Sequence, residues 1–168
     1  MSDTPTAPDE REDGAHEPQP VAELDEAARK RERRIRAFDG VTEFIGMRWE
    51  DPQTVRLTIR PELINAGGLL SGVVTYALID YCMGSTLWAQ TTREERIATI
   101  NISVNYVQSA TEGEIVCRTQ LDRRNRRSAV LRSEVVHEDG RLLVTAIGSY
   151  TIFPPRPGEG DRTPAPAS

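Results

Sequence analysis

The sequence predicts an α+β fold in which an antiparallel curved sheet wraps around one long central helix. One long apolar helical segment interrupts a series of strand-like segments, and the strand–helix alternation typical of a parallel sheet is missing. A single helix of about five turns cannot cover both faces of a six-stranded sheet. We therefore expect the sheet to curve around the helix and its outer face to be polar or covered by a partner.

The central helix is expected from about residue 71 to about residue 90. Its apolar positions recur three and four residues apart, at Val73, Tyr76, Ala77, Met83, Gly84 and Leu87. Asp80 falls on this same stripe. A buried carboxylate costs several kcal/mol unless it is paired or protonated. Asp80 is therefore a candidate for chemistry rather than for packing.

Strand signals lie on both sides of this helix. Before it, residues 44–49 form a short apolar run, and residues 54–60 alternate, with Val55, Leu57 and Ile59 on one face. Asp51-Pro52 between the two runs predicts a hairpin turn. After the helix we expect four strands in an antiparallel meander, at residues 98–108, 114–121, 128–137 and 141–153.

Both ends of the chain have a composition typical of disorder. Residues 1–26 hold four prolines and nine acids against one arginine, and residues 154–168 have almost nothing to bury. The folded domain is therefore expected at 27–153, opening with a helix over 27–38. We interpret the arginine cluster of that helix as a solvated face rather than a phosphate site.

The charge of the chain limits the kinds of ligand that we expect, and its cysteine spacing bears on metal binding and redox chemistry. The chain carries 21 basic and 26 acidic side chains, net −5; its first 26 residues contribute −8, which leaves +3 for the rest. A slightly basic domain suits a small anionic ligand and is too weakly charged to indicate nucleic acid. Cys82 and Cys117 lack metal-like or redox spacing, so we expect two reduced, buried thiols.

No apolar leader or membrane-length apolar segment is visible in the sequence. We therefore expect a cytoplasmic protein that does not act at a membrane. Nor do the residues form a metal-binding constellation, and we expect neither a metal nor another cofactor.

A spaced motif leads into the central helix. It consists of Asn65, Gly68, Ser71, Gly72 and Val73, with Asp80 nine positions after Ser71. This resembles the signature Asn-x-x-Gly-x-x-His-Gly-Gly, followed by an acid nine positions after the His, of the hotdog-fold thioesterases, specifically the PaaI-like acyl-CoA thioesterases. Two positions depart from that signature, since serine replaces the histidine and valine the second glycine. Further similarity lies at residues 44–47, 105–110, 125–130 and 139–146, so the resemblance covers about residues 38–153.

The resemblance implies the hotdog fold and the hydrolysis of acyl-CoA thioesters to free acid and CoA. In that scheme Asp80 is the general base or nucleophile, and the Gly72 backbone amide polarises the thioester carbonyl. Asn65 would position the nucleophile or water across a dimer interface. On its own, an asparagine in a loop is more often a turn former.

The resemblance also implies four substrate-binding positions besides the one at Ser71. Val73 would line the acyl pocket, and Thr99 lies near the position where relatives place a hydroxyl beside the acid. Arg126 and Arg127 belong to a hairpin that lies near the CoA phosphates in the family, and guanidinium groups bind phosphate in bidentate fashion. Thr99 could equally be an ordinary strand residue, and the arginines an exposed turn.

Ser71 has two interpretations. Its hydroxyl could donate to the substrate carbonyl or cap the helix, and we favour the cap.

The resemblance implies a homodimer or a homotetramer that binds acyl-CoA. A second hypothesis is a non-catalytic hotdog protein that binds an acyl-CoA or aromatic ligand, supported by serine at the position of the family histidine. A hotdog dehydratase is disfavoured, because such enzymes need a histidine with an acid and His137 lies at a distant turn.

Overall fold

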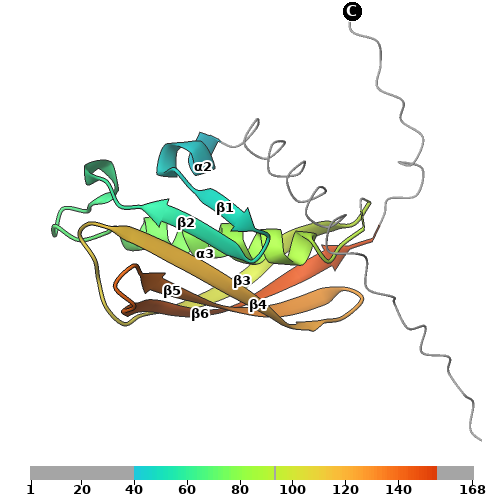
Figure 1. Cartoon of the computed structure of the whole chain (residues 1–168). Helices are drawn as coiled ribbons and strands as arrows, with labels where there is room; N and C mark the ends of the chain where they lie inside the picture. The colour runs from blue at the N-terminus through green and yellow to red at the C-terminus, as the bar shows by residue number, and fades with distance from the viewer. Residues whose placement is uncertain (1–39, 93, 155–168) are drawn as a thin grey trace, which may run out of the picture.

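The computed structural model describes residues 40–92 and 94–154, which form a six-stranded sheet curled around a long helix (Figure 1). This is the architecture that the sequence predicts. The predicted leading helix at 27–38 lies outside the described residues, as do both predicted tails except for Pro154.

The elements follow one another in a simple order. They are α2 (Gly40–Ile45), β1 (Arg48–Asp51), β2 (Thr54–Thr58), the 3-10 turn η1 (Pro61–Leu63), α3 (Gly72–Trp88), β3 (Arg96–Tyr106), β4 (Glu114–Arg124), β5 (Ser128–His137) and β6 (Leu142–Phe153). Across the sheet the order is β1-β2-β4-β5-β6-β3, and every neighbouring pair is antiparallel. β1 and β3 therefore form the two edges.

The predicted four-strand meander is wrong at its first strand, because β3 pairs with β6 rather than with β4. The segment after β3 crosses the end of the sheet. Val107 N–H donates to the Leu143 carbonyl (2.8 Å), and the Ala110 carbonyl accepts from Leu70 N–H (2.9 Å). These long-range bonds carry the chain past β5 and β6 to β4, which the local sequence pattern cannot reveal.

The predicted strand at residues 44–49 is also wrong over its first half, which belongs to the short helix α2. Thr42 accepts two backbone hydrogen bonds at its carbonyl, from Gly46 (2.9 Å) and Met47 (3.0 Å). Gly46 adopts a φ of 83°, a left-handed conformation that ends helices and favours glycine. β1 starts only at Arg48. The predicted hairpin turn at Asp51-Pro52 and the inward face of β2 are both confirmed.

The buried face of helix α3 agrees only in part with the predicted one. Met83 and Leu87 are buried as predicted, but Val73 is 77% exposed and Tyr76 is 39% exposed. The other buried positions are Thr75, Leu78, Ile79, Cys82 and Thr86. The helix is apolar nearly all round, so periodicity alone cannot select the buried face. Asp80 consequently lies at the border of the buried face and is half-buried.

Both cysteines are buried and unbridged, as the sequence predicts. The Cys82 thiol on α3 lies 3.6 Å from the Cys117 carbonyl of β4, so the pair marks a direct helix–sheet contact. In residues 40–92 and 94–154 no helix combines the length and apolar character needed to cross a bilayer. The same residues hold no cluster of three or more metal-ligating side chains.

The Met83 side chain of α3 packs directly over Gly148 of β6. A Cβ atom placed on Gly148 would lie 2.6 Å from Met83 Sδ and 3.2 Å from Ile102 Cγ1. Opposite this point β3 has a bulge at Ile100, between Thr99 and Asn101. The extra residue leaves Ile100 63% exposed, whereas regular alternation along the strand would place it on the same face as Ile102.

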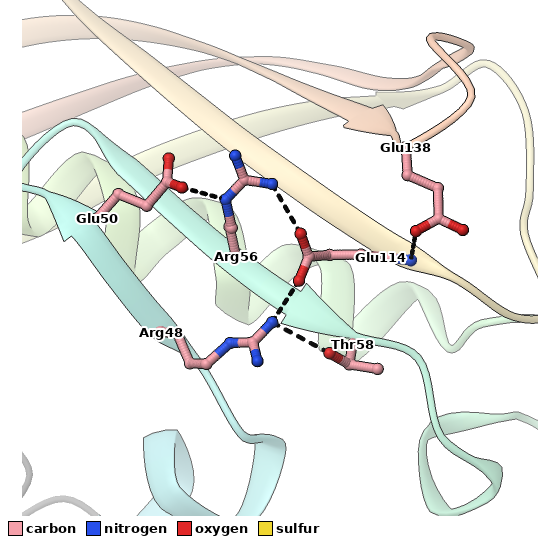
Figure 2. Close-up of polar contacts among 6 residues, drawn as sticks. All are labelled: Arg48, Glu50, Arg56, Thr58, Glu114 and Glu138. Carbon is pink, nitrogen blue, oxygen red and sulfur yellow. Dashed lines mark hydrogen bonds and ion pairs between the residues drawn. The ribbon is translucent and has the colours of Figure 1, made fainter.

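At the other edge, charged side chains tie the β1–β2 hairpin to β4 (Figure 2). Arg56 forms ion pairs with Glu50 and with Glu114 Oε1, the latter at 2.7 Å. Arg48 pairs with the other oxygen of Glu114 and donates to the Thr58 hydroxyl (3.1 Å). Exposed pairs contribute little singly, but a shared carboxylate fixes the position of the short β1 strand.

We expect Gly148→Ala to destabilise the fold by about 1–3 kcal/mol, because the new methyl group displaces Met83 in a packed core. Thermal or denaturant unfolding would measure the loss. Gly84→Ala is the matched control, since a Cβ atom placed on Gly84 would have nothing within 4 Å and alanine favours helix. A Gly148→Ala variant as stable as wild type would contradict the close approach of α3.

Candidate functional site

A tight loop precedes α3 and is organised by Asn65. The Asn65 side-chain Oδ1 accepts hydrogen bonds from the N–H groups of Gly67 (2.8 Å) and Leu69 (3.3 Å). Gly68 has a φ of 78°, which the turn requires. Asn65 therefore acts as a turn former here, one of the two roles weighed for it. With Oδ1 engaged, the carboxamide Nδ2 is the part of the side chain that can still donate.

The loop delivers the chain to the N-terminus of α3 at Gly72. The first N–H groups of a helix have no partner within the helix, and they lie at the positive end of its dipole. Ser71 occupies the N-cap position, but its side chain makes no capping hydrogen bond. The favoured interpretation of Ser71 as a side-chain cap is therefore wrong. Only its carbonyl serves the helix, accepting from the backbone of Thr75 (3.2 Å).

A cavity of about 650 Å³ opens at this end of α3. The residues around it include Asn65, Ser71, Val73, Tyr106, Val107 and Leu143. Among the described residues that line it, none carries a formal charge at neutral pH. The cavity therefore suits an uncharged group beside the helix N-terminus.

Tyr106 lies directly against Gly72 at the mouth of the helix. Its hydroxyl donates to the Gly72 carbonyl oxygen (2.9 Å), and a Cβ on Gly72 would lie 3.3 Å from the ring. Glycine at this position permits the close contact. The sequence pattern alone does not mark Tyr106 as a site residue.

A second group of polar side chains gathers around Asp80 in the middle of α3. Thr99 Oγ1 of β3 donates to Asp80 Oδ1 (2.8 Å), and the Tyr150 hydroxyl of β6 donates to the same oxygen (2.7 Å). Tyr150 is only 1% exposed. Its burial, followed by the nearby Asp80 carboxylate, raises the pKa of the Tyr150 hydroxyl well above its usual range. The phenol therefore remains a neutral donor.

Within one chain the residues around Gly72, at the N-terminus of α3, lie apart from the polar side chains around Asp80. Gly72 and Asp80 are eight residues apart on a straight helix, which corresponds to a rise of about 12 Å. On β6, the partner of Tyr106 is Val144, whereas Tyr150 pairs with Thr99. One chain thus brings Asp80 together with Thr99, but not with Asn65 or Gly72.

The arginine-rich turn between β4 and β5 lies at the Tyr150 end of the sheet, because Ala129 pairs with Tyr150. Arg124 forms an ion pair with Glu95 (2.9 Å). Arg126 and Arg127 are exposed, and among the described residues neither guanidinium has an ion-pair partner. With respect to the part of the chain that the structure describes, these two cations are free to meet an anionic ligand, as the phosphate interpretation requires.

Comparison with known proteins bears directly on this arrangement. A family model described as the thioesterase superfamily matches residues 67–144, which include the helix and the strand with Thr99. No curated protein sequence matches the chain.

Solved structures share the fold. The E. coli PaaI protein from the phenylacetic acid degradation operon superposes with a TM-score of 0.71 at 12% identity, over 79% of this chain and 97% of that one. The chain has the hotdog fold of these structures, and its residues 67–144 match the thioesterase superfamily model. The BH2602 protein from Bacillus halodurans, solved with CoA, gives 0.67 at 17% identity, over 79% and 88% of the two chains. A thioesterase from Haemophilus influenzae, HI1161, gives 0.67 at 11% identity, over 85% and 96%.

The sequence pattern indicates Asp80 as a candidate site residue but gives no such indication for Tyr150. Asp80 is visible because it interrupts an apolar helix. Tyr150 resembles any other aromatic residue of a strand, and only its pairing opposite Thr99 places it beside the carboxylate. A buried tyrosine needs a hydrogen-bond partner for its hydroxyl, and this general requirement was the signal that could have pointed to Tyr150.

His137 lies away from both groups, at the end of β5. Its Nε2 contacts the Glu112 carbonyl (2.9 Å), and its Nδ1 contacts Asp139 Oδ2 (2.9 Å). The Glu112 carbonyl, and then Asp139, raise the pKa of His137 above 6.5 despite burial. The imidazolium can donate to both oxygens at once, so His137 links the hairpin turn to the loop before β4.

We expect His137 to make stability depend on pH. Its folded pKa exceeds the unfolded value, so its contribution is complete below about pH 6.5 and is lost as pH rises through the folded pKa. Wild type should therefore lose more thermal stability than His137→Gln between about pH 6 and pH 9. Parallel scans of both proteins would measure this. Equal losses in the two would show that the histidine is not charged in the folded state.

Proposed function

We propose that the protein hydrolyses acyl-CoA thioesters to a free acid and CoA, as a PaaI-like member of the superfamily. The observation that carries the proposal is the half-buried Asp80 carboxylate, held by two hydroxyl donors on an otherwise apolar helix. A structural carboxylate at such a place would be expected to pair with a cation. In the described residues the hydrogen-bond partners of the Asp80 carboxylate are the neutral hydroxyls of Thr99 and Tyr150, which a purely structural ion pair does not explain.

In the proposed reaction Asp80 acts as general base or nucleophile. As a base it takes a proton from water while the water oxygen attacks the thioester carbonyl carbon. As a nucleophile it forms an anhydride that water then hydrolyses. In either case the C–S bond breaks, CoA leaves as a thiolate that takes up a proton, and the Gly72 amide stabilises the developing oxyanion.

Two subunits would be needed to complete this site. The rise of about 12 Å between Gly72 and Asp80 exceeds the span of one thioester and its attacking water. Edge strand β3 is open on the side away from β6, and exposed apolar side chains lie on and near it: Val73, Tyr76, Ile100 and Tyr106. We infer that two chains pair at this edge, so that Asp80 of one chain works with the partner's Asn65 and helix N-terminus.

The substrate would extend across both groups. The uncharged cavity beside Val73 would take an uncharged portion of the thioester, since a carboxylate would lose its solvation there. Arg126 and Arg127 would bind the CoA phosphates, and Ser71, freed from capping, could donate to the carbonyl.

A second candidate function is binding without turnover, favoured by serine at the position of the family histidine. A histidine side chain could hold the loop or polarise the carbonyl, and serine does this less strongly. Retained CoA affinity without hydrolysis of any acyl-CoA would support this candidate over the enzyme.

We expect Asp80→Asn to lower kcat for CoA release by about 10²–10⁴-fold, because the amide can neither accept the proton nor attack. Release of CoA from a panel of acyl-CoA thioesters, followed with a thiol reagent, measures it. Asp122→Asn is the matched control, since Asp122 is a carboxylate of β4 whose partner is Arg132 (3.3 Å). Full activity in Asp80→Asn would exclude the proposed role.

We also expect Asp80→Asn and Asn65→Ala proteins, each impaired alone, to regain activity when unfolded and refolded together. A mixed dimer contains one site with both wild-type residues, so random mixing should restore about a quarter of wild-type activity. If each site lay within one chain, mixing would restore nothing.

A further inference from the structure

Tyr150 is the residue at the candidate site that the family motif does not include. Its ring is buried, and its hydroxyl reaches Asp80 Oδ1 at 2.7 Å. We infer that Tyr150 is a positioning residue that, together with Thr99, fixes the Asp80 carboxylate so that Oδ2 is its reacting oxygen. The inference rests on the proposed function and specifies which atom of Asp80 performs it.

The hydrogen-bond geometry around the carboxylate separates its two oxygens. Thr99 Oγ1 donates to Oδ1 at 2.8 Å, so both donors that the described residues offer bond the same atom. A carboxylate oxygen has two lone-pair sites. Two donors therefore occupy Oδ1 fully, and Oδ2 is left to accept a proton from water or to attack carbon.

The two donors are placed together by strand register. Thr99 and Tyr150 are directly paired across β3 and β6, and cross-strand neighbours on one face have Cβ atoms about 5 Å apart. The bulge at Ile100 follows immediately, so Thr99 faces the helix while Ile102 also packs inward. Without the extra residue, Thr99 and Ile102 would point to opposite faces of the sheet.

The Tyr150 ring is held where a smaller hydroxyl residue could not reach. Its Cε2 would lie 3.4 Å from a Cβ on Gly148, the residue over which Met83 packs. The ring thus fills the space beside the helix and directs its hydroxyl at the carboxylate. Tyr150 also stays protonated, because burial, and then Asp80, raise the pKa of its hydroxyl.

Among residues 40–92 and 94–154 no charged side chain forms an ion pair with Asp80 in competition with the two hydroxyls. One turn before Asp80 on α3, Tyr76 is close enough to Tyr150 to influence its ionisation. The other strands packed on α3 are β2, β4 and β5, and their buried residues include no Asp, Glu, Lys or Arg. Their ionisable members are Cys117 and, at the far end of β5, His137. Tyr150 and Thr99 therefore determine the orientation of Asp80.

The test is Tyr150→Phe, which removes the donor and keeps the ring. We expect kcat to fall about tenfold with KM nearly unchanged. The acid limb of the kcat/KM profile should move up by about one pH unit, because the lost bond favoured the charged carboxylate. Tyr81→Phe is the matched control, because Tyr81 directly follows Asp80 on α3. This substitution should leave the acid limb of the profile unchanged. A lower kcat with an unmoved acid limb would indicate a merely structural role and overturn the inference.

A shape-preserving variant covers the case in which Tyr150→Phe does not fold. Incorporation of 3-fluorotyrosine at position 150 makes the phenol a stronger donor, so the acid limb should move to lower pH. An unmoved limb in this variant would also overturn the inference.

An infrared measurement separates failure of this inference from failure of the proposed function. The difference between wild type and Asp80→Asn, both with ¹³C-labelled aspartate, isolates the carboxylate stretches of Asp80. Bonding at one oxygen widens their separation, and Tyr150→Phe should narrow it whether or not the protein hydrolyses thioesters. Narrowing without hydrolysis would support the positioning and reject the enzyme. Hydrolysis with an unchanged spectrum would overturn the positioning.

Discussion

The contact between α3 and β6 at Gly148 is the constraint on which the rest of the arrangement depends. Because residue 148 has no side chain, the Met83 side chain of α3 can occupy the space directly over β6. Asp80 is one turn before Met83, and Tyr150 is two residues after Gly148. The same close approach therefore brings the carboxylate within hydrogen-bond distance of the tyrosine. The packing of the core and the geometry of the candidate site therefore depend on the same contact between α3 and β6.

The sheet makes the second contribution through its irregularities. A regular β3 could not direct both Thr99 and Ile102 at the helix, and the bulge at Ile100 resolves the conflict. It also turns Ile100 outward at the open edge of the sheet, where the proposed second subunit would cover it. The bulge thus serves the carboxylate on one face and the proposed interface on the other.

Local sequence patterns predicted what depends on local chemistry. Alternation located β5 at its observed bounds, and a lone acid in an apolar helix indicated Asp80 as a candidate site residue. Patterns failed where the answer depended on distant residues. The pairing of β3 with β6 is supported by long-range bonds such as Val107 to Leu143, and the role proposed for Tyr150 depends on its pairing with Thr99. Residues 44 and 45 were too short an apolar run to distinguish helix from strand.

The two halves of the proposed site, the Gly72 backbone amide and the Asp80 carboxylate, depend on sequence in different ways, as the serine at position 71 shows. Oxyanion stabilisation at Gly72 would come from a backbone N–H and the helix dipole, which any residue at position 71 leaves intact provided that α3 begins at Gly72. Asp80, by contrast, would act through one side-chain oxygen, and its orientation is set by two specific hydroxyls. Replacement of the family histidine by serine is therefore compatible with hydrolysis, since it changes a neighbour of the amide and none of the groups that hold the carboxylate.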